Sequence, residues 1–559
     1  MRESPKVQHC QVDVPMIPGD HRRGDLRMSS EIPRAKSSPS MSFVRGLRLL
    51  WAAWPTVVPL VCLVASWFAL RRGFFGHVDI PLWDETEYLA SGWRLLHHAQ
   101  IHTLLPGSPL YVIWYALWHL VAHDAIVVLY GQWLVIDLLV AVTILFVMRA
   151  GGANGLFAYL TAAYWSSLIC MWDPPRVGFF ALLLALLAAL AERRGKHTRA
   201  ILLVAGAALS RPEYLLAGVL WLLIRSWPKM ASRTRLVVAT VTPIVLLLAV
   251  TGAVPGLGSE RTWVAFAQHY TLRWAAEHPS LLTEPWLDWP QAVTISFPGA
   301  HSIGGAFLSN PHEVLHHVAS NLLEYPGLLV TLLASPALPG RVVGPAILSG
   351  LLLAVAVRRR WPQPVAWRTS GLLLVACVSV LPSLLVKPKA VYALPLLLLT
   401  LMGMARLARS LVGATVGEGN RLGLGACVAA TLALWLVPPT PPASLPVAGT
   451  LSGLRSIWSQ QGPNPNWRML EADGGWCTYL DYEKCKAEWL QKVVAGTTFA
   501  EYLRETSANA ILVSDNFRKY PGIRHDPEFA RFERDPASFG FRLVLSNPRY
   551  AFFLRTSRD

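Results

Sequence analysis

Apolar residues along this chain gather into blocks rather than alternating with polar ones. Blocks of about 20 apolar residues are typical of helices that cross a bilayer. We therefore predict eleven spans, with bounds at residues 49–70, 126–148, 153–171, 176–191, 199–210, 213–225, 236–254, 338–357, 369–385, 391–405 and 422–438. The fifth and sixth blocks are short, and we interpret them as a hairpin held inside the bundle, where broken helices are tolerated.

Basic residues fall mainly in the loops on one side of the predicted bundle. Arg149, the segment 192–199 and the arginine run 358–360 all belong to this side. Cytoplasmic loops carry the excess of Lys and Arg, so this side is predicted to face the cytoplasm. The N-terminus is then inside and the C-terminus outside. Arg71 and Arg72 fall on the outer side and count mildly against this orientation.

The segments between and beyond the blocks define the predicted domains. Residues 1–45 read as a disordered cytoplasmic N-terminus, because Pro, Ser and mixed charge dominate them. Residues 46–440 hold the transmembrane domain, with long outer loops at 71–125 and 255–337. Residues 441–559 hold a Pro-rich linker and a periplasmic domain. The predicted fold is thus mainly α, a polytopic membrane helical bundle with a small α+β C-terminal extracytoplasmic domain.

The overall composition supports a membrane protein. Of the 559 residues, 53% are hydrophobic and 15% are charged, and the mean hydropathy is +0.38. The net charge of +16 comes mostly from loops that would meet anionic lipid, so nucleic acid is not implied as a partner. We find no P-loop, no dinucleotide fingerprint, no HExxH and no GxSxG motif.

Two cysteines differ from the rest by lying in the outward tail. Cys477 and Cys485 occur in “WCTYLDYEKC”, beyond the last predicted span. In an oxidising compartment they can form a disulfide, and the sequence leaves open whether they do. Their spacing does not fit a zinc finger. Within the same tail, “NAILVSDN” predicts a strand and “GFRLVLSNPRYAFFLR” predicts a hairpin.

Clustered carboxylates directly after the first span are the first sign of chemistry. Asp84 and Glu85 begin “DETEYLASGWRLLHHA”, which predicts an amphipathic surface helix with Asp84 at or near its N-cap. Helix capping alone would explain one acid. Asp173, however, falls in the short outer turn after the third span, on the same predicted face. Carboxylates that converge there could act as a general base, bind a metal or stabilise a cationic transition state.

Cations on the outer side form a second candidate group. Arg211 and Glu213 fall at the break between the two short spans, and Lys387 and Lys389 lie at the outer end of the ninth span. Pairing with Glu213 could explain the arginine, and snorkelling to the interface could explain the lysines. Such cations also suit the phosphate of a lipid-linked substrate. The segment 107–123 is interpreted as juxtamembrane or re-entrant, because another span would reverse the orientation.

The ordered set of these motifs resembles the GT-C superfamily of integral-membrane glycosyltransferases. The branch in question comprises protein O-mannosyltransferases and lipid A aminoarabinose transferases. The resemblance runs from about residue 45 to 440 and includes “WDETEYL”, “GSPLYVIWYAL”, “WDPPRVGFF”, “SRPEYLL” and “KPKAVYALP”. It implies that Asp84 is the catalytic carboxylate, with Glu85 as the adjacent acid and Asp173 as the acid of the second loop.

The resemblance also assigns a donor phosphate site. It implies that Lys387, Lys389 and Tyr392 handle the phosphate, to which the sequence adds Arg211. The aminoarabinose branch often has a lysine where this chain has Ser108, which departs from the pattern. Phosphate binding would then fall to the other cations.

We therefore expect an inverting glycosyltransferase of the bacterial inner membrane. It would move a sugar from a polyprenyl-phosphate donor to an extracytoplasmic protein, lipid or glycan. No cofactor is certain; a divalent metal is possible, with Asp84 and one of the outer-loop histidines as candidate ligands. The alternatives are a flippase for lipid-linked sugars, which would need polar residues at mid-membrane depth, and a non-catalytic scaffold for the C-terminal domain.

Overall fold

The computed structural model describes most of the chain. The described residues are 39–72, 78–101, 108–172, 176–226, 232, 260–282, 284–333, 370–412, 416–436, 445–462, 465–490 and 497–556. The chain divides into two units, Met1–Trp54 and Pro55–Asp559, and the contacts discussed below lie within the second. The predicted disordered N-terminus lies outside the described residues, apart from the start of the first helix.

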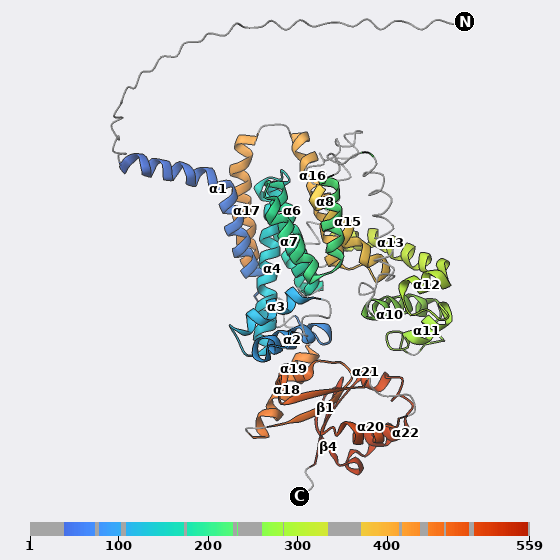
Figure 1. Cartoon of the computed structure of the whole chain (residues 1–559). Coiled ribbons are helices and arrows are strands. Elements are labelled where there is room, and N and C mark those ends of the chain that lie inside the picture. The colour runs from blue at the N-terminus through green and yellow to red at the C-terminus, as the bar shows by residue number, and fades with distance from the viewer. Residues whose placement is uncertain are drawn as a thin grey trace, which may run out of the picture. The chain divides into compact units, whose positions relative to one another are not determined.

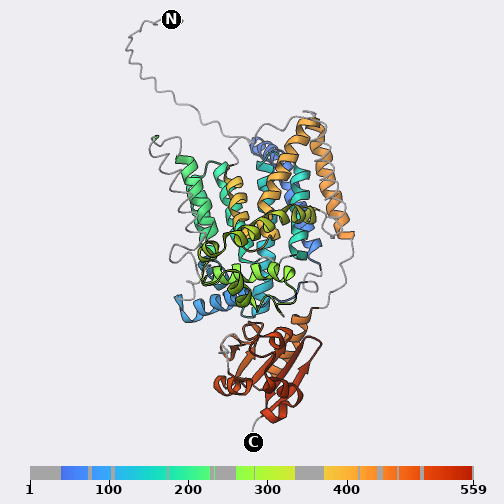
Figure 2. The same ribbon diagram turned by 90° about the vertical axis from the view of Figure 1, so that its right-hand side faces the viewer.

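Apolar helices run next to one another in the larger part of the second unit (Figures 1 and 2). They are α1 (Pro39–Leu70), α4 (Ala125–Ala150), α5 (Gly155–Trp172), α6 (Val177–Arg193), α7 (His197–Ser210), α8 (Glu213–Ser226), α15 (Ser370–Leu385), α16 (Ala390–Val412) and α17 (Val416–Leu436). Each coincides with a predicted span to within several residues, apart from longer ends on α1, α16 and α17. The predicted spans 236–254 and 338–357 lie outside the described residues.

One described helix is both long and apolar enough to cross a bilayer, namely Ala125–Ala150. Shorter apolar segments accompany it at Trp54–Leu70, His197–Ser210, Glu213–Leu223, Gly371–Leu385, Ala390–Gly403 and Gly423–Leu436. A mainly helical fold with a small sheet is confirmed. The number of spans stays a prediction.

Helix α4 lies at the centre of the apolar core because it is apolar on all sides. Trp133, Ile136, Val140 and Ile144 along it are fully buried. Its neighbours α5 and α6 both pack against it.

A buried ion pair joins the end of α1 to the middle of α4. The Arg71 guanidinium donates to Oδ2 of Asp137, with Nε at 2.9 Å, and Trp67 Nε1 donates to the same oxygen at 2.7 Å. Arg71 also donates to the Ser166 carbonyl oxygen at 2.6 Å. Arg71 is only 8% exposed and Asp137 only 1%, so each charge depends on the other for compensation.

Arg72, which like Arg71 falls on the predicted outer side, also contacts another helix of the bundle. Arg72 donates to the carbonyl oxygens of Leu434 and Trp435 at 3.0 Å each, at the end of α17. Its guanidinium lies 4.8 Å from the Trp435 ring centroid. Cations at a helix C-terminus are favourable, so Arg71 and Arg72 serve helix packing and carry little weight as loop charges.

Helices from the two predicted outer loops cluster near one end of the apolar helices. The first loop forms α2 (Asp84–His98) and α3 (Pro109–His119). The second forms α10 (Glu260–Glu277), α11 (Trp289–Ser296), α12 (Ile303–Ser309) and α13 (Pro311–Leu333), which share a core of their own around Phe266, Tyr270 and Phe297.

The C-terminal domain, residues 445–556, combines a five-stranded sheet with short helices. Its elements are α18 (Pro446–Gln460), β1 (Trp467–Glu471), α19 (Trp476–Leu480), β2 (Cys485–Trp489), α20 (Phe499–Thr506), β3 (Ala510–Ser514), α21 (Asp515–Lys519), α22 (Pro527–Arg534), a 3-10 turn (Pro536–Phe539), β4 (Phe541–Ser546) and β5 (Tyr550–Arg555). The strand order is β2-β1-β3-β5-β4, with β1 parallel to β2 and β3 and the last pairs antiparallel. The segments that predicted a strand and a hairpin form β3 and β4–β5.

A disulfide bond braces this domain. Cys477 in α19 and Cys485 at the start of β2 are joined, with their Cα atoms 4.9 Å apart. Both cysteines are buried.

The buried ion pair yields a stability prediction. Arg71→Ala or Asp137→Ala leaves one charge buried without its partner, so we expect the free energy of unfolding to fall by about 3–5 kcal/mol. The double variant Arg71→Met/Asp137→Leu should recover most of that loss, because no charge is stranded. The measurement is the temperature at which half of the detergent-purified protein loses its folded size-exclusion peak. Arg199→Ala, at an exposed arginine of α7, is the control; single variants as stable as this control would contradict the prediction.

Candidate active site

The two candidate acids occupy the first turn of α2. Trp83 is the N-cap residue, and its side chain makes no capping hydrogen bond. Asp84, which the sequence predicted at or near the N-cap, is the first helical residue. The Asp84 side chain is exposed. It lies in the first turn of the helix, where a negative side chain interacts favourably with the helix dipole.

Glu85 points into the protein instead. It is 2% exposed, and the Tyr111 hydroxyl donates to its Oε1 at 2.6 Å. The Tyr115 hydroxyl donates to the same oxygen. Burial raises the pKa of Glu85 above the usual carboxyl range, while the two tyrosine hydrogen bonds and the positive charge of Arg176 oppose that rise. Glu85 therefore joins α2 to α3, whereas its neighbour Asp84 is exposed.

Close contact between α2 and α3 makes this arrangement possible. A Cβ at Gly92 would lie 2.6 Å from Tyr115 Cβ and 2.8 Å from the Ala116 nitrogen, so only glycine fits there. Tyr88 in α2 also lies 3.3 Å from Ser108 Oγ, at the N-cap of α3. Ser108, the position that departs from the aminoarabinose pattern, thus contacts α2.

The second-loop acid, Asp173, lies outside the described residues. Arg176, three positions later, is described and is the N-cap residue of α6. Its charge acts on Glu85 and on Tyr479 of the C-terminal domain. Phe180, in the first turn of α6, lies with its ring centroid 5.5 Å from that of Tyr111, which donates to Glu85, so the start of α6 is close to that carboxyl.

Predicted phosphate-binding residues gather where α7, α8 and α16 meet. Arg211 Nη2 donates to the Tyr392 hydroxyl at 2.9 Å, and Arg211 Nε donates to Glu213 Oε1 at 2.7 Å. The pairing considered for Arg211 and Glu213 is thus present, and Tyr392 joins it. Lys387 and Lys389 are exposed in the loop between α15 and α16, and the Tyr392 amide donates to the Lys389 carbonyl oxygen at 3.1 Å.

The first turn of α6 lies between the acids and the cations. Phe180 in this turn packs against Tyr111, the hydrogen-bond partner of Glu85, and the N-cap residue of the helix is Arg176. Two residues later, a Cβ at Gly178 would lie 3.4 Å from Val391 Cγ2, next to Tyr392 on α16. The acidic start of α2 and the basic start of α16 therefore border the same helical turn.

Residues of the second outer loop, whose histidines the sequence offered only as possible metal ligands, hold the lysine loop in place. His317 Nε2 lies 3.1 Å from the Leu385 carbonyl oxygen. Asn321 Nδ2 donates to the Leu384 carbonyl oxygen at 2.7 Å and to that of Val386 at 3.3 Å. These side chains of α13 satisfy carbonyl groups at the end of α15, directly before Lys387.

His269 of α10 also lies near this loop. Burial lowers the pKa of His269 to about 4, and the charges of Lys389 and Lys387 add to the effect. The imidazole is therefore neutral at physiological pH. The sequence shows that His269 belongs to a His-rich loop, but no sequence feature indicated that this histidine, rather than another, lies near the lysines.

Metal binding has no complete donor set among the described residues. They contain no group of three or more His, Cys, Asp or Glu side chains that could hold an ion. A metal role for Asp84 stays a prediction, since Asp173 lies outside the described part of the chain.

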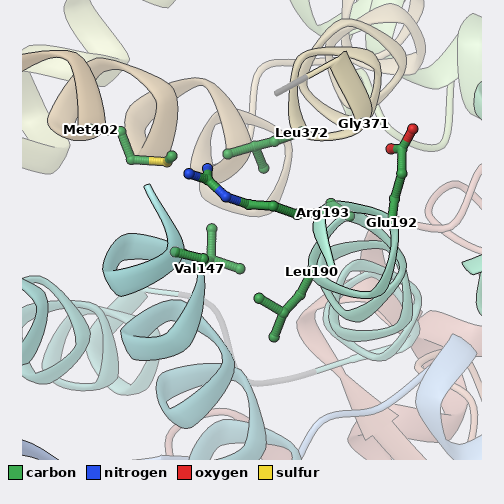
Figure 3. A pocket seen from close by; sticks show the side chains of 9 residues that line it. Val147, Leu190, Glu192, Arg193, Gly371, Leu372 and Met402 are labelled. Carbon is green, nitrogen blue, oxygen red and sulfur yellow. The ribbon is translucent and has the colours of Figure 1, made fainter. Parts of the chain in front are cut away.

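A surface pocket elsewhere does not belong to this site (Figure 3). Its lining includes Val147, Glu192, Arg193 and Met402. Glu192 lies at the C-terminal end of α6, whereas Arg176 precedes its first turn. A 17-residue helix separates the two by roughly 25 Å.

Comparisons with known proteins assign no family. No protein-family model and no curated protein matches the chain. Among solved structures, it is similar to the crystal structure of ArnT from Cupriavidus metallidurans bound to undecaprenyl phosphate. That likeness covers 90% of this chain and 98% of the other, at 16% identity and a TM-score of 0.32. A TM-score this low does not establish a shared fold, so the likeness decides neither fold nor activity.

Proposed function

We propose that this protein is an integral-membrane, inverting glycosyltransferase of the GT-C type. It moves a sugar from a polyprenyl-phosphate donor to an extracytoplasmic protein, lipid or glycan. One observation carries the proposal: Tyr111, the partner of Glu85, and Val391, next to Tyr392, both pack against the first turn of α6. A sugar phosphate needs both a base near the attacking oxygen and cations near the leaving group.

The membrane location rests on the run of apolar helices and on the basic loops. About eleven spans would place the N-terminus in the cytoplasm and the C-terminal domain in the periplasm, in a bacterial inner membrane. Arg71 and Arg72 no longer argue against this orientation, because Asp137 and the end of α17 use their charges.

In the proposed reaction, an acceptor hydroxyl oxygen attacks the anomeric carbon from the face opposite the phosphate. The bond between that carbon and the phosphate oxygen breaks, and its electron pair stays on the phosphate. The acceptor proton passes to the Asp84 carboxylate, which acts as general base. Asp84 suits this role because its side chain is exposed at the start of α2, where an acceptor can reach it.

The leaving group is a phosphate monoester that is already ionised. It requires charge neutralisation rather than protonation. Lys387 and Lys389 would supply it from the loop before α16, with Arg211 and the Tyr392 hydroxyl beside them. Glu213 keeps the Arg211 guanidinium oriented toward Tyr392.

Glu85 is assigned a supporting role in this scheme. Its carboxyl is buried and accepts hydrogen bonds from Tyr111 and Tyr115, so an acceptor cannot reach it without opening the α2–α3 contact. Asp173 stays the second acid of the proposal, on the ground of its place in the sequence, three positions before Arg176 at the start of α6.

The alternatives make different demands. A flippase needs a polar path at mid-membrane depth, whereas the candidate acids and cations gather near the outer ends of the helices. A non-catalytic scaffold needs neither acid. If a change of one carboxyl group, such as Asp84→Asn, abolishes sugar transfer, the scaffold alternative is eliminated.

The proposed topology can be tested directly. Alkaline phosphatase fused after residue 556 should be active, because the enzyme folds only outside the cytoplasm. A fusion within the basic segment 192–199 should be inactive. A silent phosphatase at the C-terminus, with an active cytoplasmic reporter at the same point, would overturn the orientation.

The catalytic acid is tested by a pair of neighbouring variants. Asp84→Asn keeps size but removes the charge, so transfer should fall about a hundredfold or more. Glu85→Gln keeps an acceptor for both tyrosines and should cost less. Purified protein is assayed with a panel of undecaprenyl-phosphate-linked mannose, glucose and aminoarabinose, using envelope extract from cells lacking the gene as acceptor. Mass spectrometry detects the product. Near-normal turnover in Asp84→Asn at normal expression would reject the assignment.

The phosphate site is tested by binding. Lys387→Gln/Lys389→Gln removes two cations from the proposed site, so undecaprenyl phosphate should bind about tenfold more weakly or worse, given about 1.5–3 kcal/mol for a hydrogen bond to a charged group. Fluorescence titration of protein in nanodiscs gives the Kd. Lys196→Gln changes an exposed lysine at the opposite ends of the helices and serves as control. Equal affinity in the two variants would place the phosphate elsewhere.

A further inference from the structure

In the segment that leads into α2, three alternate residues form hydrogen bonds with the C-terminal domain. They are Asp79, Pro81 and Trp83. Asp79 accepts the amides of Val447 and Ala448 at 3.1 and 2.9 Å, and so caps α18 from a distant part of the chain. The Pro81 carbonyl oxygen accepts the Tyr479 hydroxyl at 2.6 Å. Two residues further on, Trp83 makes the contact that lies closest to the candidate base.

Trp83 contacts a glycine pair that follows β1. Its amide donates to the Gly474 carbonyl oxygen at 2.9 Å. A Cβ at Gly475 would lie 2.2 Å from Thr86 Oγ1 and 2.5 Å from Thr86 Cγ2. Real side chains never approach so closely, so the loop and the first turn of α2 meet only because position 475 is glycine.

The backbone of Trp83 shows why such support is needed. Its φ is 68°, a conformation that a residue with a bulky side chain rarely adopts. Strain of this kind persists only where the surroundings over-determine it. Trp83 directly precedes Asp84, so its dihedral angles set the direction in which α2, and the Asp84 carboxylate, emerge.

The glycine loop is itself rigidly held. The two carboxyl oxygens of Glu471 accept the amides of Gly475 and Trp476 at 2.9 and 3.3 Å, and Glu471 is only 1% exposed. The next residue, Cys477, is tied to β2 by the disulfide. The loop therefore has the rigidity to impose a geometry on α2.

We propose that the C-terminal domain completes the transferase site, and that Gly475 is a positioning residue that orients Asp84 through Trp83 and Thr86. This inference rests on the proposed function and deepens it. The domain would then be required for catalysis and not only for presentation of a periplasmic surface.

The test compares two glycine variants of the full-length protein. Gly475→Ala introduces a Cβ at a φ of +109° and against Thr86. Gly540→Ala introduces one at a φ of +75° in the same domain, with nothing within 4 Å. Both variants strain a turn, but only the first pushes on α2. We expect kcat to fall about tenfold or more in Gly475→Ala, with KM for the active donor and Kd for undecaprenyl phosphate unchanged, and to stay within about twofold of wild type in Gly540→Ala.

A milder variant guards against misfolding. Tyr479→Phe keeps the buried ring and removes only the hydrogen bond to Pro81, so a loss of about threefold in kcat is expected from one hydrogen bond. Hydrogen exchange of the peptide spanning residues 80–96 is measured in parallel. It should be faster in Gly475→Ala and Tyr479→Phe than in Gly540→Ala.

The outcomes separate this inference from the function on which it rests. If Asp84→Asn is inactive while Gly475→Ala keeps wild-type kcat and slow exchange over residues 80–96, the positioning role is wrong and the transferase stands. If no donor in the panel is used by wild type, the proposed function fails. In that case, equal hydrogen exchange over residues 80–96 in Gly475→Ala and Gly540→Ala would also overturn the positioning role of Gly475.

Discussion

Burial of the Glu85 carboxyl against two tyrosines is the constraint on which the outer part of this molecule depends. The hydroxyls of Tyr111 and Tyr115 donate to it, and a glycine at position 92 lets α2 and α3 approach closely enough for both to reach. A buried polar group without partners would be costly, so the helix pair holds one arrangement. Glu85 inside leaves Asp84 outside, since neighbouring helical residues lie about 100° apart.

The same principle of paired burial organises the apolar helices. Arg71 and Asp137 compensate each other between α1 and α4, and Arg211 is held between Glu213 and Tyr392. Each arginine has a partner from a distant part of the sequence, Asp137 for Arg71 and Tyr392 for Arg211. The first pair serves stability, because it is fully enclosed. The second lies beside the exposed loop of Lys387 and Lys389, which is why we connect it with an anionic ligand.

The C-terminal domain is bound to the bundle through the segment that precedes α2, through α2 itself and through the start of α4, where Arg455 pairs with Asp124. Main-chain groups at Pro81 and Trp83 and the Asp79 carboxylate all take part. Contacts to the second outer loop are ion pairs, from Arg524 to Asp288 and from Lys519 to Glu284. The domain thus touches both loops that carry candidate site residues.

Hydrophobic block length by itself determined the helical character, and every predicted span within the described residues is a helix. The strand and hairpin of the tail were likewise readable, because alternation and turn residues are local signals. Acids and cations could be named as candidates from their positions at the helix ends. The sequence could not separate Asp84 from Glu85 by burial, nor foresee that Arg71 is neutralised by Asp137 or that a glycine loop near residue 475 contacts Trp83. Those facts depend on contacts between residues far apart in the chain, and only the tertiary structure decides which side chains meet and which charges lose their water.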